Sequence, residues 1–314
     1  MIPRRLLPHP LLAFAALAGE VAAAKPAYPP VLPDAREETY KTAGEAKLKL
    51  WIFSPQEPKS SGGKKPAVVF FFGGGWRSGN PAQFAPQCRY LASRGVVAVT
   101  ADYRVSTRHG TKATACVEDG KSAVRWMRAN AERLGVDPNK IAAGGGSAGG
   151  HVAAAVGTVP GFEAKGEDHT VSSRPDALLL FNPAVLLASV PEYKFPPEKD
   201  ASRRERAGTD PMKISPYHHL AKEAPPTLIF HGKKDDAVDF RTVRLYEKQA
   251  KKLGALCKLH AFEDMPHGFF NWGRFDNKPF RDTMLATDQF LAELGWLRGL
   301  KGKPSIDAFI KANR

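Results

Sequence analysis

Residues 143–151 read Ala-Gly-Gly-Gly-Ser-Ala-Gly-Gly-His and place one serine in a glycine-rich turn. A short apolar run at 140–143 precedes the turn, and an alanine-rich stretch suited to a helix follows it. The pattern predicts a strand, a tight turn and a helix, with Ser147 at the apex. Gly145 and Gly149 would keep the backbone thin where strand and helix approach each other. Because a chain with 28 glycines can contain Gly-x-Ser-x-Gly by accident, a plain glycine-rich turn is the alternative.

The sequence around this turn alternates between strand-like and helix-like segments. Residues 46–54 alternate in polarity and predict an outer strand with one wet face, on which Trp51 would lie. Continuous apolar runs are typical of central parallel strands that are covered on both faces; they occupy 67–72, 96–100, 177–181 and 227–230. Helical periodicity is clearest over 115–134, and further helices are expected over 81–93, 148–157, 239–253 and 281–297. The alternation predicts an α/β fold with a mostly parallel central sheet and helices on both faces.

The length of 314 residues and the lack of repeats or a linker favour one domain over 25–314, with a core at about 40–297. One stretch breaks the alternation. Residues 186–220 carry several prolines and a charge run without a clear period. A connection of this length indicates either a lid or substrate-shaping insertion, or a mobile surface loop.

The first 24 residues have the pattern of a secretory signal peptide. Arg4 and Arg5 precede an apolar stretch at 11–18, and small residues suit cleavage before Lys25, with Gly19 as a second option. The apolar stretch is too short for an ordinary membrane helix, although it could also form a buried first helix. We therefore expect export, to the periplasm or the medium, and no stable membrane span after cleavage.

The formal net charge is +14, and the basic residues are spread over many segments. A solvated basic surface is the favoured interpretation, because no nucleic-acid motif accompanies the charge. The three cysteines are too few for a disulfide-built scaffold and lack zinc spacing. Export would permit one disulfide. We expect it between Cys88 and Cys116, with buried free thiols as the alternative.

A serine hydroxyl becomes a nucleophile when a base removes its proton and an acid orients that base. Asp235 follows the apolar run at 227–230, and His267 follows the next expected strand, at 256–262. The order Ser147, Asp235, His267 is the one expected of a serine hydrolase on such a sheet. Asp236 competes with Asp235 for the acid's role.

The other histidines are weaker candidates for the base. His151 and His231 are expected to be structural, whereas His218 and His219 lie in the irregular stretch without a paired acid at a strand end.

Residues 72–76, Phe-Gly-Gly-Gly-Trp, follow the first central run. Glycines there let backbone N–H groups approach a reacting carbonyl, and the N–H of Ala148 would supply a further donor. A phosphate-binding loop is the alternative, but the Lys-Ser/Thr ending of a P-loop is absent.

Together these residues resemble the α/β-hydrolase superfamily, in particular its carbohydrate-esterase, feruloyl-esterase and lipase-like group. The resemblance covers nearly all of residues 40–297. It rests on Gly73-Gly74-Gly75-Trp76 with Gly79, Asp102-Tyr103-Arg104, Gly145-Gly146-Ser147-Ala148-Gly149-Gly150, Ser215-Pro216, His231-Gly232 with Asp235 and Val238, and His267-Gly268-Phe269.

The resemblance implies ester hydrolysis through an acyl-enzyme. Ser147 would be the nucleophile, His267 the base and then the acid, and Asp235 the residue that orients His267. The oxyanion-hole positions would be Gly74, Gly75 and Ala148. This chemistry calls for neither a metal nor an organic cofactor. Phe72 stands where the family commonly has a histidine that braces the oxyanion loop, which puts the geometry of that loop in question.

We therefore expect an exported serine esterase that hydrolyses short-chain or feruloyl-type esters, for example one that deacetylates a carbohydrate such as xylan. A lipase or a peptidase on the same fold is the alternative, although no long apolar lid and no additional domain are visible. A non-catalytic hydrolase-like binding protein would lack a triad residue, whereas all three are present. The acyl group, the alcohol and the oligomeric state are not specified by the sequence.

Overall fold

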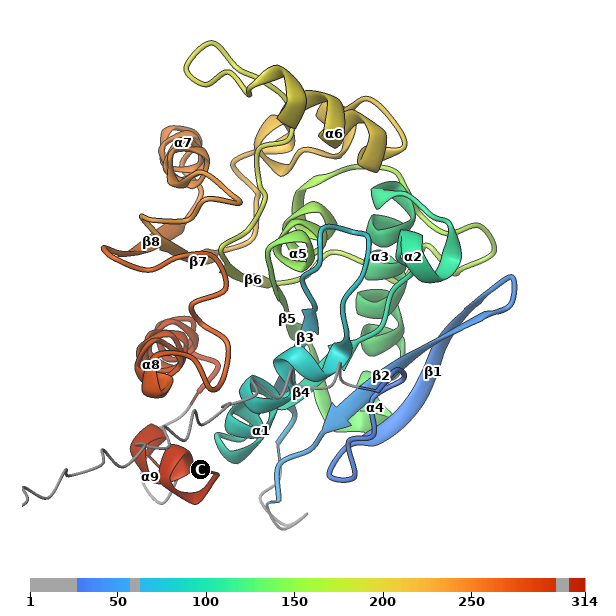
Figure 1. Ribbon diagram of the computed structural model, residues 1–314. Coiled ribbons are helices and arrows are strands. Elements are labelled where there is room, and N and C mark those ends of the chain that lie inside the picture. Colours follow the sequence, from blue (N-terminus) through green and yellow to red (C-terminus); the bar gives the residue numbers. More distant parts are fainter. Residues whose placement is uncertain (1–26, 57–62, 298–304, 314) are drawn as a thin grey trace, which may run out of the picture.

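The structure is a computed structural model that describes residues 27–56, 63–297 and 305–313 (Figure 1). The expected signal peptide at 1–24 lies outside the described residues. Within the described ranges, no helix is long and apolar enough to cross a membrane.

An eight-stranded sheet runs through the molecule in the order β1-β2-β4-β3-β5-β6-β7-β8. The first two neighbouring pairs, β1 with β2 and β2 with β4, are antiparallel, and the other pairs are parallel. The predicted mostly parallel sheet is therefore confirmed. The strands are β1 Arg36–Ala43, β2 Ala46–Phe53, β3 Lys65–Phe71, β4 Val97–Ala101, β5 Val136–Gly146, β6 Ala177–Phe181, β7 Thr227–Gly232 and β8 Cys257–Phe262.

Helices cover both faces of this sheet, as predicted (Figure 1). One face carries α3 (Ala113–Ala129), α5 (Ala148–Thr158) and α7 (Phe240–Leu253). The opposite face carries α1 (Ala85–Ser93), α8 (Lys278–Glu293) and α9 (Ile306–Ala312). The shorter helices are α2 Ser106–His109, α4 Ala131–Leu134 and α6 Pro197–Ala207.

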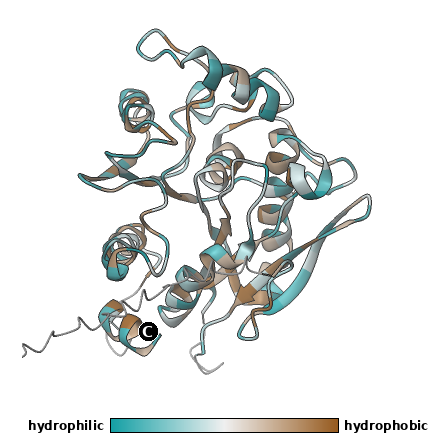
Figure 2. Ribbon diagram, in the orientation of Figure 1, coloured by the Kyte–Doolittle hydropathy of each residue, from teal (hydrophilic) through white to brown (hydrophobic). Residues whose placement is uncertain are grey.

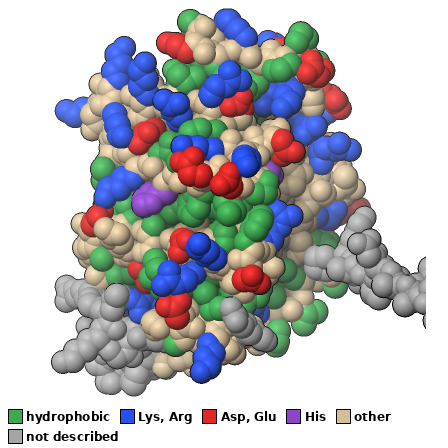
Figure 3. All heavy atoms as spheres, turned by 60° about the vertical axis from the view of Figure 1, so that its left-hand side comes forward, with side chains coloured by type: hydrophobic (Ala, Val, Ile, Leu, Met, Phe, Trp, Pro, Cys, Tyr) green, Lys and Arg blue, Asp and Glu red, His purple; other side chains and the backbone are tan. Residues whose placement is uncertain are grey.

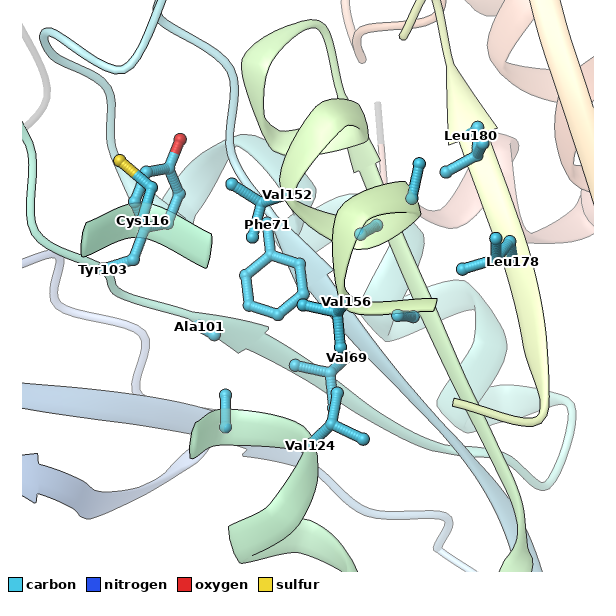
Figure 4. Packing of buried hydrophobic residues seen from close by; sticks show 14 of the residues in the cluster. Val69, Phe71, Ala101, Tyr103, Cys116, Val124, Val152, Val156, Leu178 and Leu180 are labelled. Carbon is cyan, nitrogen blue, oxygen red and sulfur yellow. The ribbon is translucent and has the colours of Figure 1, made fainter. Parts of the chain in front are cut away.

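The core consists of two main apolar clusters that the sheet separates. In β3, Val69 and Phe71 belong to one cluster, whereas Val68 and Phe70 belong to the other. Figure 4 shows the first cluster, where Phe71 packs near Val152 of α5. Figure 2 shows hydrophobic central strands and more hydrophilic outer helices. Because successive side chains of a strand point to opposite faces, burial on both faces requires the continuous apolar runs of the sequence.

The expectation for the edge of the sheet was wrong. The outermost strand is β1, which was not predicted, and β2 lies inside it. Trp51, which was expected on a wet face, is fully buried in the cluster beneath α1. The polar strand β1 pairs with β2 along its length and forms the exposed edge of the sheet.

The expected disulfide between Cys88 and Cys116 is also absent. Cys88 belongs to α1 and Cys116 to α3, so the two lie in clusters on opposite faces of the sheet. Both are buried free thiols, as is Cys257. Burial raises the pKa of each thiol.

The irregular stretch at 186–220 contains the helix α6 and two short 3-10 turns, Pro211–Ile214 and Pro216–His219. Pro197 lies in the first turn of α6, with acidic residues in that turn and basic residues in the last one. Both features suit helix ends. Because only Ala207 of α6 is buried, the sequence of this helix shows no periodic spacing of apolar residues.

The positive charge forms no single patch on the face shown in Figure 3. Lys and Arg side chains are interspersed there with Asp and Glu. This distribution agrees with the interpretation of a solvated basic surface.

Candidate active site

Ser147 lies at the sharp turn between β5 and α5. Its backbone has φ 55 and ψ −117, which is strained for a residue with a side chain. Its N–H donates to the carbonyl of Phe181 over 2.9 Å. A Cβ on Gly149 would lie 2.0 Å from the carbonyl oxygen of Phe71, and one on Gly145 would lie 2.5 Å from that of Gly149. The glycines are therefore required where strand and helix meet, as the sequence suggests.

The structure brings Ser147, His267 and Asp235 together. His267 Nε2 lies 2.9 Å from the Oγ of Ser147, and His267 Nδ1 donates to Oδ2 of Asp235 over 2.7 Å. Asp235 follows β7, and His267 follows β8. Both residues therefore lie at the carboxyl edge of the parallel strands, where β5 also ends at Ser147. The arrangement can pass the hydroxyl proton of Ser147 to an imidazole whose other nitrogen is held by a carboxylate.

Asp235, and not Asp236, is the acid that contacts His267. Oδ1 of Asp235 accepts the N–H groups of Ala237 and Val238 over 3.0 and 2.8 Å. Burial raises the pKa of the Asp235 carboxyl, but hydrogen bonds from His231, His267 and Val238 outweigh it and hold that pKa below its usual range. Asp235 is therefore ionised and can orient the imidazole of His267. His231, 3.2 Å from Oδ2, holds the carboxylate and not the nucleophile.

The glycine loop after β3 lies beside Ser147. The N–H of Gly73 already donates to Oε1 of Gln83 over 2.7 Å. By contrast, no group of the described residues accepts a hydrogen bond from the N–H of Gly74 or from that of Gly75. Both glycines line the same cavity as Ser147 and Ala148. A Cβ on Gly74 would lie 2.1 Å from the carbonyl oxygen of Ser78, so the tight turn excludes any other residue there.

Phe72 occupies the position of the missing histidine and is fully buried. Its ring stacks on Tyr103 with centroids 4.1 Å apart, and its carbonyl accepts the hydroxyl of Tyr103 over 2.6 Å. At the other end of the loop, Nε1 of Trp76 donates to Nδ1 of His151 over 3.0 Å. Aromatic packing and this hydrogen bond therefore brace the loop.

The proteins that this chain is similar to agree with the chemistry of the triad. The BD-FAE family model matches residues 52–249. The chain belongs to the BD-FAE family. Among solved structures, it is 48% identical to Thermogutta terrifontis esterase 2 phosphonylated by sarin, with a TM-score of 0.84. That match covers 87% of this chain and 99% of the esterase. The butyrate-bound form of the same esterase is also 48% identical, with a TM-score of 0.83 over 88% of this chain and 100% of the esterase.

Curated relatives of this BD-FAE member are more distant. A probable carboxylic ester hydrolase, LipM of Mycobacterium tuberculosis, is 26% identical over 70% of this chain and 52% of its own length. An acetylxylan esterase of Xylanibacter ruminicola is 25% identical over 70% of this chain and 42% of its own length. The chain thus spans about half the length of the curated relatives it matches. The relatives are carboxylic ester hydrolases, in agreement with the α/β-hydrolase resemblance of the sequence.

Three amide side chains of this BD-FAE member support the site and were not predicted. Oδ1 of Asn182 accepts the N–H of Gly268 over 2.9 Å. Asn271 donates to the carbonyl of Gly268 over 2.8 Å and accepts from Gln83 over 3.0 Å. The position of Asn182 directly after β6 is a signal that could have identified it. Gln83 lies in a 3-10 turn after the glycine loop, where no sequence pattern indicates a site.

A cavity of about 1060 Å³ opens above Ser147. Five of its lining residues come from α6: Glu198, Lys199, Ser202, Arg203 and Arg206. The segment at 186–220 therefore supplies one wall of the cavity. Within the described ranges, no group of three or more His, Cys, Asp or Glu side chains is placed to hold a metal ion.

Proposed function

We propose that the protein is a serine carboxylesterase that acts on short acyl esters through an acyl-enzyme on Ser147. The observation that carries this proposal is the continuous hydrogen-bonded chain from Ser147 Oγ through His267 to Asp235, with 2.9 and 2.7 Å contacts. Ser147 faces a cavity that Gly74 and Gly75 also line, and the backbone N–H groups of these two glycines have no acceptor among the described residues.

The reaction proceeds in two halves. Oγ of Ser147 attacks the ester carbonyl while Nε2 of His267 takes the hydroxyl proton. The negative charge that develops on the carbonyl oxygen is stabilised by the N–H groups of Gly74, Gly75 and Ala148. The C–O bond to the alcohol breaks, and the alcohol leaves with the proton from His267. Water then attacks the acyl-enzyme with His267 as its base, which releases the acid and restores Ser147.

The short acyl preference is supported by the related Thermogutta terrifontis esterase 2, of which propionate-bound and butyrate-bound structures are known. A carbohydrate as the alcohol part is supported by the similarity to the Xylanibacter ruminicola acetylxylan esterase. We infer that acetylated carbohydrates, xylan among them, and feruloyl esters are the substrates to test first. A lipase, a peptidase and a non-catalytic binding protein are the competing functions.

The test compares wild type with Ser147→Ala on para-nitrophenyl acetate, butyrate and ferulate, followed by acetate release from acetylated xylan. We expect the wild type to release nitrophenol and the variant to lose nearly all of that activity. Equal rates for the two proteins would contradict the proposal. A lipase would instead prefer long-chain esters, and a binding protein would hydrolyse none.

We further propose that residues 1–24 direct export and are removed before Lys25. The support is the basic start, apolar stretch and small residues of that segment. N-terminal sequencing of the protein from the periplasm or the medium should begin at Lys25, or near Gly19. An intact Met1 on exported protein would contradict cleavage.

A further inference from the structure

A second cavity, of about 520 Å³, adjoins the catalytic one. The two cavities share four lining residues, namely Gly75, Trp76, Ser202 and Arg206. The first pair belongs to the oxyanion loop and the second to α6. The side chain of Arg206 lies close to the loop, since a Cβ on Gly75 would be 3.2 Å from its Nη1. Arg206 therefore stands where a substrate would pass from one cavity to the other.

The lining of the second cavity is strongly cationic. Arg77, Lys112 and Arg206 line it, whereas Glu205 is the only acidic residue among the described residues of its lining. None of the three cations forms an ion pair with a carboxylate of the described residues. The other Arg side chains of α3 and α6 do have partners: Arg125, Arg128 and Arg204 form ion pairs, and Arg203 stacks on the ring of Phe195. Arg77 and Lys112 are exposed and Arg206 is half-buried, and an anion placed among the three would be attracted by their combined charge.

Two polar features of this cavity's lining also lack a hydrogen-bonding partner among the described residues. Oγ1 of Thr111 is buried and has no hydrogen-bond partner in the part of the chain that the structure describes. The next residue, Lys112, is the N-cap of the 17-residue helix α3, and no side chain caps this helix end. A hydroxyl group and the residue that precedes the positive end of a helix therefore belong to the same lining as the cations. Thr111 and Lys112 both line it.

We propose that the second cavity binds a carboxylate on the alcohol part of the substrate, so that the esterase prefers acylated sugars bearing a uronic acid. The proposal rests on the proposed esterase function. We assign the carboxylate to the alcohol part because a short acyl group is too small to extend from Ser147 into a second cavity. Arg206 would hold the carboxylate by paired N–H donors, and Lys112 would add a second charge.

The test measures kcat/KM for acetate release from O-acetylated methyl glucuronoside and O-acetylated methyl glucoside, which differ in a carboxylate. We expect wild type to prefer the acidic sugar about tenfold, mainly through KM. Arg206→Gln and Lys112→Gln should each reduce that ratio severalfold. Arg204→Gln is the matched control, because Arg204 lies on the same helix but pairs with Asp200 over 2.9 Å and lines neither cavity. Melting temperatures check the folding of all three variants.

The outcomes separate this proposal from the esterase function. If wild type hydrolyses both sugars without preference, or if the preference survives in Arg206→Gln and Lys112→Gln, the carboxylate site is overturned. A preference for mono-para-nitrophenyl glutarate over para-nitrophenyl pentanoate, without one among the sugars, would place the anion on the acyl side and also overturn it. If wild type hydrolyses no ester at all, the esterase function itself fails.

Discussion

Oε1 of Gln83 accepts the backbone N–H of Gly73 over 2.7 Å, which ties the glycine loop to the turn that follows it. The Nε2 of the same side chain donates to Asn271, which in turn donates to the carbonyl of Gly268. One amide therefore connects the loop that would stabilise the oxyanion with the loop that carries His267. Gln83 and Asn271 are 188 residues apart in sequence.

Gln83→Leu should lower kcat for a short-chain nitrophenyl ester by about tenfold, equivalent to about 1.4 kcal/mol, with a smaller change in KM. The reason is that Gly73 loses its acceptor and the neighbouring N–H groups lose their fixed direction. Gln289→Leu, on the exposed face of α8, is the control and should keep wild-type kinetics. An unchanged kcat in Gln83→Leu would show that the loop is held without this hydrogen bond.

Asp235→Asn should lower kcat by roughly a factor of ten thousand, as expected when the acid of a triad can no longer fix the imidazole tautomer. The adjacent Asp236→Asn should change kcat by no more than about twofold, because its carboxylate makes no hydrogen bond to His267. Steady-state kinetics on one ester, with circular dichroism to confirm folding, distinguish the two. Similar losses in both variants would contradict the assignment of Asp235.

Much of this site follows from local sequence because its residues sit at the ends of recognisable strands. Ser147 comes directly after a predicted strand, and Asp235 and His267 lie in the loops that follow two further predicted strands. Parallel strands bring their carboxyl ends to one edge of the sheet. The choice between Asp235 and Asp236 could not be made in this way. It depends on which carboxylate turns inward to the N–H of Val238, a contact that only the folded loop defines.

The features of the fold that the sequence did not predict either show no periodic spacing of apolar residues or depend on residues far away in the sequence. The polar strand β1 shows no continuous apolar run, since only Tyr40 of it is buried. The helix expected over 115–134 breaks at Asn130 into α3 and α4. The separation of Cys88 from Cys116 follows from which face of the sheet each helix covers, and residue spacing carries no information on that.

His151 should make the stability of the protein depend on pH. Burial lowers its pKa from 6.5 to about 4, although the hydrogen bond to the carbonyl of Ile214 acts in the opposite direction. Between pH 4 and pH 6.5, His151 therefore binds a proton in the unfolded chain but not in the folded protein. The free energy of unfolding therefore falls as the pH drops from 6.5 to 4, by up to about 3 kcal/mol from this residue.

Urea unfolding of wild type and His151→Gln at several pH values between 4 and 7 measures this contribution. The glutamine amide can still accept from Trp76 and donate to Ile214, but it does not titrate. The free energy of unfolding should fall less for the variant than for wild type as the pH drops, even if the variant is the less stable protein at pH 7. Parallel curves for wild type and His151→Gln would exclude His151 as a source of the pH dependence.

Gly149→Ala should destabilise the protein by about 3 kcal/mol or prevent its folding. The new Cβ would lie 2.0 Å from the carbonyl oxygen of Phe71 and 2.3 Å from that of Phe72. These are backbone atoms of β3 and its adjoining loop, so they cannot move aside as a side chain would. Gly63→Ala is the control, because no atom lies within 4 Å of its Cβ position. We expect a change within about 0.5 kcal/mol there. Equal melting temperatures for the two variants would mean that α5 can move away from β3, and the packed turn around Ser147 would then not be rigid.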